Sequence, residues 1–598
     1  MPATLESFGV AVDFLSGFEP FSTTNLGVFA RAVRRQILRH EHVVAFDGEK
    51  IVGYAGWLPT TVAAAEAWVK NGADLRPVDG KADAAALTTV AVTDPKVTLG
   101  LMRAARELNP GIRVFFKRSY ADPERTPRKA AVQNRTDLGA RRPVSAPAEP
   151  RAPAPRVAAT AVSPPRHAKR PPIADDPCAF LYALAERTPG ATERVPVGDS
   201  SVLVVQDPKV AARVLFDNLA NYTKNFASFT PFFGRSRLTL DGAPWRHSQR
   251  ISQSFIAPHD TARATAIVAR LYAGLADELI AKGGTAEPVD PDIDRAAVAA
   301  LTEIAFSTPM AELGDDFAAD LRPIIRYAAM RAWDLPGVPS ILDGDTLAEA
   351  QAATARIRAA IAGAVERRRA GPSSNDALSA MIAAADDTAD EPEAARIDLA
   401  GELLTLVVAG SDTTSAALGW ALSILAAAPP FQDALRAEIH AACGSEEPTM
   451  AVLDRVPSLR PFIDETLRMF PPVAILSRFA EGADTLDGHA VTAGDRVLVS
   501  VIGLHQNPAS WDAPREFRPD RFDPDAPGRG ERRSHFMAFS AGPRICGGAR
   551  FAQIEMAVAL IQILRRCRLE VKEPLPFLFD WGASMRRRGG QKLRVTAL

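Results

Sequence analysis

The segment that decides the fold reads FSAGPRICGG over residues 539–548, and a helical run begins directly after it at Ala549. Cys546 stands among glycines, which permit a tight loop with close backbone approach and unusual φ angles. A cysteine just before a helix N-terminus is favoured as a thiolate. The segment therefore predicts a cysteine prepared to act as a ligand. The alternative is a buried structural cysteine in a glycine turn, which is the usual role of a lone cysteine.

The neighbours of Cys546 have the chemistry that a thiolate-bound haem requires. Gly542 and Gly548 let the backbone come close to a flat porphyrin, so that N–H groups can reach the sulfur. Arg544 can pair with a propionate, and Phe539 can shield the sulfur from water. The stretch resembles the haem-binding signature of the cytochromes P450, F-x-x-G-x-R-x-C-x-G, at every specified position. The resemblance implies haem b with Cys546 as the axial ligand of the iron.

Two upstream segments resemble the same family. Glu465 and Arg468 have an i,i+3 spacing that puts them on one face of a helix ending at FPP (residues 470–472), and FRPDRF (residues 517–522) supplies Arg521. In P450s such residues form a buried charge network behind the cysteine loop, so we expect a structural role for all three. Without Cys546 downstream the pair is a weak signal, since most such pairs lie at the surface.

An apolar helix predicted over residues 398–427 contains AGSDTT at 409–414. Asp and Thr are costly inside a helix because both prefer caps and turns, and by themselves they fit a kinked core helix. The segment resembles the P450 helix on the distal side of the haem. The resemblance implies that Gly410 leaves space for dioxygen, Thr413 donates a hydrogen bond to the oxygen being activated, and Asp412 relays protons from solvent.

Further propionate contacts are expected from the family pattern. Arg478, in ILSRFAE, follows the PPV segment where the family often has an arginine. The segment WRHSQR (residues 245–250) is similar to the family's W-x-x-x-R helix, but Gln249 occupies the arginine position. We therefore assign the contact to Arg250, and we expect His247 to be structural or an additional propionate contact.

Composition divides the chain at residues 137–172, where Pro, Ala and Arg dominate and no apolar period survives. This is typical of an extended, semi-rigid linker. Residues 173–598 carry the P450 motifs, and we expect a mainly helical domain with a minor β-sheet. The apolar periods predict strands near 192–205 and 486–500 and helices over 260–282, 292–305, 345–370, 398–427, 430–443 and 458–469.

Residues 1–136 predict a small α/β domain, with a hairpin around Asp47-Gly48 and further elements over 25–39 (helix), 86–92 (strand), 97–108 (helix) and 112–120 (strand). The order is similar to an N-acetyltransferase-like fold, and IVGYAGWL, LMRAARELNPG and RVFFKR resemble the toxin-activating lysine acyltransferases. That family's catalytic residues are missing, because FEPFSTTN holds no histidine and LTTVAVT holds no acid. We expect a non-catalytic domain that binds an acyl chain, a carrier protein or a partner subunit.

The bulk composition argues against several classes of protein. A net charge of −1 over 598 residues does not favour nucleic acid or an anionic membrane surface. Four cysteines without CxxC spacing argue against a zinc site or a disulfide framework. We see neither a signal peptide nor an apolar run of about 18 residues. The expected protein is cytoplasmic and has no membrane span.

Together these patterns predict a haem-thiolate monooxygenase that inserts one atom of O2 into a small hydrophobic or acyl-type substrate. Since the chain shows no flavin or iron–sulfur segment, electrons would come from a separate ferredoxin, flavodoxin or reductase. One alternative is a P450-type peroxygenase or isomerase, against which Asp412 and Thr413 argue. Another is a non-catalytic haem-binding protein whose first domain binds a partner. The missing histidine disfavours a bifunctional acyltransferase–oxygenase.

Overall fold

The chain divides into two compact units, Met1–Arg151 and Ala152–Leu598, which we describe separately. The predicted linker at 137–172 lies outside the described residues. The computed structural model describes residues 11–12, 14–15, 26–39, 41–47, 50–71, 82–93, 101, 105, 108, 113–118, 128–133, 173, 176–226, 229–256, 261–282, 288–332, 344–392, 396–571, 578–581 and 583–598.

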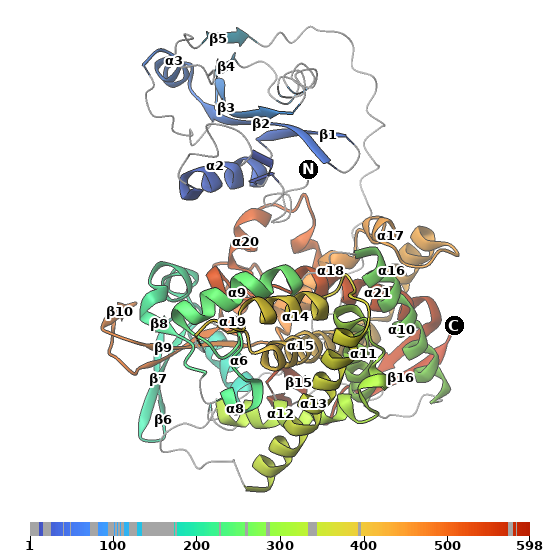
Figure 1. Ribbon diagram of the computed structural model, residues 1–598. Coiled ribbons are helices and arrows are strands. Elements are labelled where there is room, and N and C mark those ends of the chain that lie inside the picture. The colour runs from blue at the N-terminus through green and yellow to red at the C-terminus, as the bar shows by residue number, and fades with distance from the viewer. Residues whose placement is uncertain are drawn as a thin grey trace. The chain divides into compact units, whose positions relative to one another are not determined.

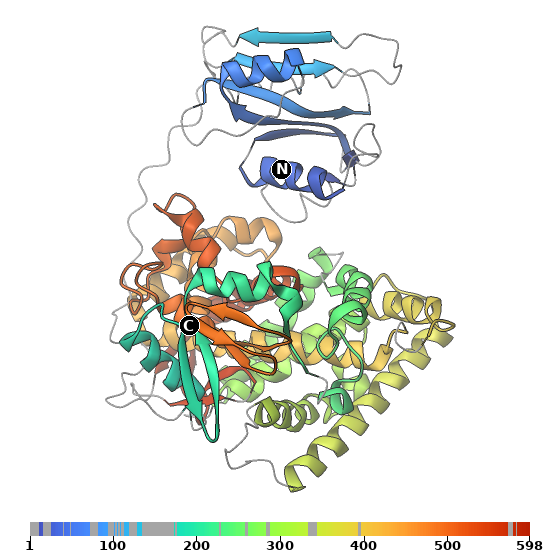
Figure 2. The same cartoon turned by 90° about the vertical axis from the view of Figure 1, so that its left-hand side faces the viewer.

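The first unit is built on a five-stranded sheet in the order β1-β2-β3-β4-β5 (Figure 2). Only β3 and β4 are parallel, and every other neighbouring pair is antiparallel. The expected helix, hairpin and two later strands are present. The unit contains α2 (Leu26–Leu38), β1 (His42–Asp47), β2 (Lys50–Thr60), α3 (Val62–Asn71), β3 (Ala84–Val92), β4 (Arg113–Arg118) and β5 (Arg128–Gln133).

Two elements of this unit were not predicted, α3 and β5. The sequence of α3, VAAAEAWVKN, is rich in alanine and lacks a clear apolar period, although the side chain of Thr61 accepts a hydrogen bond from the Ala64 N–H at its start. Most of the predicted helix 97–108 lies outside the described residues. Leu101 and Ala105 within it are helical and buried, and they pack with Trp57 and other residues of the sheet.

The second unit is mainly helical (Figure 1). All six predicted helices are present, with ends shifted by one or two residues: α10 (Thr261–Ala281), α11 (Asp290–Phe306), α13 (Gly344–Ala370), α15 (Leu399–Ala427), α16 (Pro429–Cys443) and α18 (Leu459–Met469). The run after the cysteine loop forms α21 (Ala549–Arg566). The remaining helices and turns are α6 (Pro177–Arg187), α7 (Pro208–Ala212), η1 (Arg213–Asp217), η2 (Leu219–Asn221), α8 (Thr230–Phe233), α9 (Gly242–Ile256), η4 (Met310–Leu313), α12 (Phe317–Ala332), α14 (Ala377–Asp387), α17 (Met450–Asp454), α19 (Val501–Gln506), η5 (Pro519–Phe522), α20 (Arg529–His535) and η6 (Gly542–Arg544).

The minor β-structure lies mostly to one side of the helices (Figure 1). Its main sheet has the order β6-β7-β12-β9-β8, and β7 pairs with β12 in parallel although about 290 residues separate them. The strands of this sheet are β6 (Glu193–Val197), β7 (Ser200–Val205), β8 (Tyr222–Thr223), β9 (Ile475–Ala480) and β12 (Arg496–Ser500). Three two-stranded ribbons complete the described β-structure of this unit: β10 (Asp484–Leu486) with β11 (His489–Val491), β13 (Cys567–Val571) with β16 (Leu593–Ala597), and β14 (Phe579–Trp581) with β15 (Met585–Arg587).

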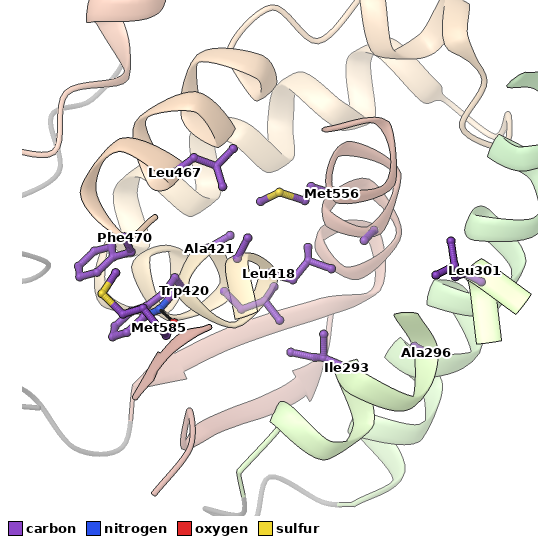
Figure 3. Close-up of a cluster of buried hydrophobic side chains, with 14 of the residues drawn as sticks. Ile293, Ala296, Leu301, Leu418, Trp420, Ala421, Leu467, Phe470, Met556 and Met585 are labelled. Atoms are coloured by element: carbon purple, nitrogen blue, oxygen red, sulfur yellow. Dashed lines mark hydrogen bonds between the residues drawn. The ribbon is translucent and has the colours of Figure 1, made fainter. Parts of the chain in front are cut away.

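The core of this unit surrounds α15. Figure 3 shows Leu418, Trp420 and Ala421 of this helix among apolar side chains from α11, α18 and α21. The Trp420 ring stacks on Phe470 with centroids 4.3 Å apart, and its indole N–H donates to the carbonyl of Met585 at 2.8 Å. The last turns of α15 are therefore held firmly, which sets the position of its polar middle segment.

No single helix in the described part of the chain is long and apolar enough to cross a membrane. Taken together, α15 and α16 pass the same test, but the chain bends by 109° between them.

One buried carboxyl lies away from the motifs. Glu555 of α21 is 1% exposed and accepts a hydrogen bond from the Tyr272 hydroxyl of α10 at 3.0 Å. Burial raises the pKa of this carboxyl to about 8, although the Tyr272 hydrogen bond acts in the opposite direction. Near neutral pH the folded protein therefore holds Glu555 protonated, whereas the unfolded chain ionises it.

We expect Glu555→Gln to stabilise the protein at alkaline pH and to have little effect near pH 5. A raised folded-state pKa contributes stability that is complete below the unfolded pKa and is lost as pH rises through the folded pKa. The uncharged variant escapes this loss, which between about pH 5 and about pH 8 is on the order of several kcal/mol. Urea unfolding near pH 5 and at alkaline pH measures the free energy of unfolding of the wild type and of the variant. Glu570→Gln, at an exposed position, is the control. An equal stability difference at both pH values would contradict the assignment.

Candidate functional site

Cys546 lies in the loop between η6 and α21. Its backbone N–H donates to the carbonyl of Phe539 at 2.9 Å, which closes the loop on itself. Burial raises the pKa of the thiol, while the backbone N–H groups of Gly548 and Ala549 and the cations of this region oppose that rise. Gly548 is the N-cap of α21, so these N–H groups belong to the helix start. The residue Cys546 still has solvent-accessible surface, although the protein atoms around it desolvate the thiol, whereas the other three cysteines are buried.

Gly542 lets the cysteine loop pack closely against a neighbouring turn. Its φ is +73°, and an added Cβ would lie 2.2 Å from the carbonyl oxygen of Leu215 in η1. The glycine is therefore required for close packing of the loop against η1. Phe539 is partly buried and packs on the main core, which anchors the start of the loop.

The structure brings Glu465, Arg468 and Arg521 together in the interior. Glu465 and Arg468 both have fully buried side chains and form two hydrogen bonds of 2.7 and 2.8 Å. Arg521 Nε lies 3.3 Å from Glu465 Oε1, and the backbone N–H of Arg518 donates to the same oxygen at 2.7 Å. The carboxylate thus has several donors, as a buried charge requires.

His505 connects this network to the cysteine loop, and sequence reasoning missed it. Arg468 Nη1 donates to the His505 carbonyl at 2.8 Å, and His505 Nδ1 lies 3.1 Å from the Arg468 carbonyl. The backbone N–H of Met537, near the start of the loop, donates to His505 Nε2 at 2.9 Å. Burial lowers the pKa of His505 to about 3, so the ring is neutral and Nδ1 carries its proton. A lone histidine gave no sequence signal for this role.

The middle of α15 differs in exposure from its two ends. Residues 401–405 and 414–422 are buried, whereas Ala409 is exposed and its neighbours Val408, Gly410, Asp412 and Thr413 are partly exposed. A long core helix therefore has one short stretch that protein covers only in part, and this stretch carries the Asp–Thr pair. Gly410 allows α15 to pack closely on α11, because an added Cβ would lie 2.8 Å from the side chain of Leu301.

The two polar residues of that stretch have defined partners. Asp412 Oδ1 accepts from Arg586 Nη2 at 2.8 Å, and Oδ2 accepts from the Ser584 hydroxyl at 2.6 Å. The Thr413 hydroxyl donates to the carbonyl of Ala409 at 2.8 Å. Because that bond uses its hydrogen, the hydroxyl remains available as an acceptor, where we had expected a donor.

Cations gather beside Cys546. Lys224, Arg237, Arg478 and Arg544 influence one another or the thiol electrostatically, with Asp241 as a nearby carboxylate. Arg544 pairs with Asp241, donates to the Leu240 carbonyl at 2.8 Å and lies 4.1 Å above the Trp245 ring. Arg478 is 3% exposed and donates to the Ser477 carbonyl at 2.8 Å. Arg544 and Arg478 were predicted here, whereas isolated Lys224 and Arg237 gave no motif signal.

This cluster fits a dianionic haem. Burial lowers the pKa of Lys224 to about 7, and repulsion from Arg544 and Arg478 adds to the effect, which indicates too few anions nearby. Burial also lowers the pKa of Arg478 and of Arg544 to about 10 each. His247 Nε2 is buried and has no hydrogen-bond partner among the residues that the structure describes. Two propionates would supply the missing charge and an acceptor for such donors.

Arg250 is not assigned by the structure. It lies on α9, but its side chain is outside the described part of the chain. Gln249, at the family's arginine position, donates from Nε2 to the Pro543 carbonyl at 2.9 Å. The residue that departs from the family pattern therefore contacts the cysteine loop directly.

The comparisons with known proteins agree with this geometry. The Cytochrome P450 family model matches residues 174–593. Protein LUTEIN DEFICIENT 5, chloroplastic, of Arabidopsis thaliana is 26% identical over 70% of this chain and 74% of its own length. Cytochrome P450 4X1 of Rattus norvegicus is 37% identical, over 35% of this chain and 41% of its own. Leukotriene-B4 omega-hydroxylase 3 of Mus musculus is 37% identical, over 35% and 40%. The chain thus spans about two fifths of the two rodent relatives.

Solved structures show the same fold. The haem domain of cytochrome P450DA superposes with a TM-score of 0.62 at 19% identity, covering 73% of this chain and 97% of that chain. The cytochrome P450 CYP102L1 gives a TM-score of 0.59 at 23% identity, covering 71% and 98%. With the family model matched across the cysteine loop, the buried charge network and α15, the chain belongs to the cytochrome P450 family and is a monooxygenase that uses haem b.

Proposed function

We propose that Cys546 is the axial haem ligand and that the chain inserts one atom of O2 into a small hydrophobic or acyl-type substrate, with electrons from a separate ferredoxin, flavodoxin or reductase. The observation that carries the proposal is the exposed Cys546 beside a surplus of buried cations. When bound, the haem supplies dioxygen activation, to which a thiolate contributes by donating electron density. The rodent relative named for omega-hydroxylation of leukotriene B4 supports an acyl-type substrate.

The protein's own groups would prepare the ligand and hold the cofactor. The N–H groups of Gly548 and Ala549 point to the thiol and stabilise its anionic form against burial. The propionates would be bound by Arg478, Arg544 and Lys224. Gln249 would hold the loop in place through its hydrogen bond to the Pro543 carbonyl. Glu465, Arg468 and Arg521 would keep a structural role, since in the described part of the chain the connection from Arg468 to the start of the loop runs through His505.

Proton delivery is assigned to the exposed stretch of α15. Asp412 would take protons from solvent and pass them toward Thr413, whose hydroxyl is available to accept a hydrogen bond from a protonated group beside the helix. A peroxygenase or isomerase has no need of such a pair. The acid–alcohol pair at the partly exposed middle of the helix therefore supports monooxygenation over these alternatives.

For the first unit we propose a binding role without acyl transfer. Its mixed sheet, with the single parallel pair β3–β4, supports an N-acetyltransferase-like fold. The segments where the acyltransferases have their catalytic histidine and aspartate, FEPFSTTN and LTTVAVT, hold neither residue. This supports a non-catalytic module that binds an acyl chain, a carrier protein or a partner subunit.

The wild-type protein, reduced and exposed to carbon monoxide, is expected to show the red-shifted Soret band of thiolate-ligated haem. Cys546→His should abolish that band, because imidazole replaces the thiolate. Absorption spectroscopy makes the measurement, and the buried Cys443→Ser serves as control. A histidine-type band in the wild type would overturn the assignment.

Arg478→Met is expected to weaken haem retention, because it removes a buried cation that would face a propionate. Transfer of haem to apomyoglobin should be several-fold faster than for the wild type, in proportion to the lost charge-assisted hydrogen bonds. Arg455→Met, at an exposed site with its side chain 50% exposed, is the matched control. Equal transfer rates for all three proteins would contradict the assignment of Arg478 as a propionate contact.

Asp412→Asn is expected to lower NADPH-dependent turnover roughly 10²-fold, at the low end of the range for a general acid. Thr413→Ala should instead divert consumed O2 to hydrogen peroxide. Both are measured with a ferredoxin and its reductase and with dodecanoic acid as the probe substrate. The exposed Asp454→Asn is the control. If Asp412→Asn matched this control, the pair would have no part in proton delivery.

A further inference from the structure

Arg586 lies on β15 in the C-terminal ribbon and contacts carboxylates from two other elements. Its Nη2 is 2.8 Å from Asp412 Oδ1 of α15 and 2.9 Å from Asp294 Oδ1 of α11, and its Nη1 is 3.9 Å from Asp290 Oδ1. It also donates to the carbonyl of Asp412 at 3.1 Å and to the Ser415 hydroxyl at 2.8 Å. None of the sequence motifs includes this residue.

These contacts determine the orientation of Asp412. One carboxylate oxygen is held by Arg586 and the other by Ser584, which precedes β15. The side chain of Asp412 is 11% exposed, so water cannot substitute freely for either donor. A carboxylate held in this way keeps one rotamer, so its oxygens stay at fixed positions beside Thr413.

Arg586 has further carboxylates with which its guanidinium can form ion pairs. Asp290 and Asp294 both face it from α11, and the Asp294 side chain is 27% exposed, which connects the group to solvent. Arg322 of α12 lies 3.4 Å from the second oxygen of Asp294. Burial by itself would lower the pKa of Arg586, but the three carboxylates raise it above its ordinary value, so the guanidinium stays charged. Proton uptake by Asp412 therefore leaves no unpaired cation.

We propose that Arg586 is a positioning residue for proton delivery, holding Asp412 as an oriented carboxylate and keeping its own charge on Asp290 and Asp294 while Asp412 is protonated. The inference rests on the function proposed above. A proton passes from water to the Asp412 carboxylate and onward to the Thr413 side, after which Asp412 is again an anion bound to Arg586. The step moves only a proton and leaves every oxidation state unchanged.

The competing explanation is that Arg586 only fastens the C-terminal ribbon to α15. The two explanations differ in what they change. A fastening role affects thermal stability and haem content. A positioning role affects a rate that depends on proton transfer. The Lys variant should rescue that rate because it keeps the positive charge beside Asp412, although it lacks the planar fork of Arg.

The test uses the full-length holoprotein with a ferredoxin, its reductase and dodecanoic acid. Three variants are first matched for haem content and carbon monoxide spectrum: Arg586→Gln, Arg586→Lys and the control Arg588→Gln. Arg588 lies in the turn directly after β15, and its wild-type side chain is 54% exposed. We expect Arg586→Gln to raise the solvent deuterium isotope effect on NADPH oxidation and to divert several-fold more O2 to hydrogen peroxide. Arg586→Lys should restore most of both. This readout does not require dodecanoic acid to be the natural substrate.

A double variant makes the test sharper. If Arg586 acts through Asp412, adding Arg586→Gln to Asp412→Asn should cause little further change, because two residues that act as one unit are not additive. The inference alone fails if Asp412→Asn slows turnover as proposed while Arg586→Gln has the isotope effect and peroxide yield of Arg588→Gln. If the wild type oxidises no NADPH with any electron donor, the proposed function fails first.

Discussion

The ion pair between Glu465 and Arg468 is the interaction on which the rest of the site depends. Both side chains are fully buried, and leaving either charge unpaired would cost about 3–5 kcal/mol. The surrounding chain therefore has to supply donors and acceptors at fixed positions. It does so through Arg521, the Arg518 N–H and the carbonyl of His505. Since His505 also binds the Met537 N–H, the requirement extends to the start of the cysteine loop.

Two clusters of charged side chains differ in the sign of their excess charge. One would serve haem binding and the other proton delivery. Beside Cys546, buried cations outnumber carboxylates, and burial with mutual repulsion lowers the pKa of Lys224. Such a group stabilises a bound dianion. Along α15 the balance is reversed, because one arginine is shared by three carboxylates. Such a group can gain a proton and stay paired. The same helical core, packed around Trp420, supports both.

The first unit shows where pattern reasoning works and where it fails. Its hairpin and strands have alternating or β-branched residues and a turn signal, and they appear as β1, β2, β3 and β4. Its second helix was missed, because an alanine-rich segment has no apolar period to read. Gln36 forms hydrogen bonds with Thr88 and with Tyr54 inside this unit. No sequence rule pairs residues so far apart.

The sequence by itself determined the family of the P450 unit, its main helices, the cysteine loop and the residues of the buried ion pair. Those features depend on local spacing and local periodicity, which a chain displays without folding. Only the tertiary structure decided that His505 joins the network, that Lys224 and Arg237 lie with the propionate candidates, and that Arg586 holds Asp412. These contacts join segments brought together by helix packing and by a strand ribbon. Their residues are single, ordinary charged groups, so nothing in the local sequence distinguishes them from solvated ones.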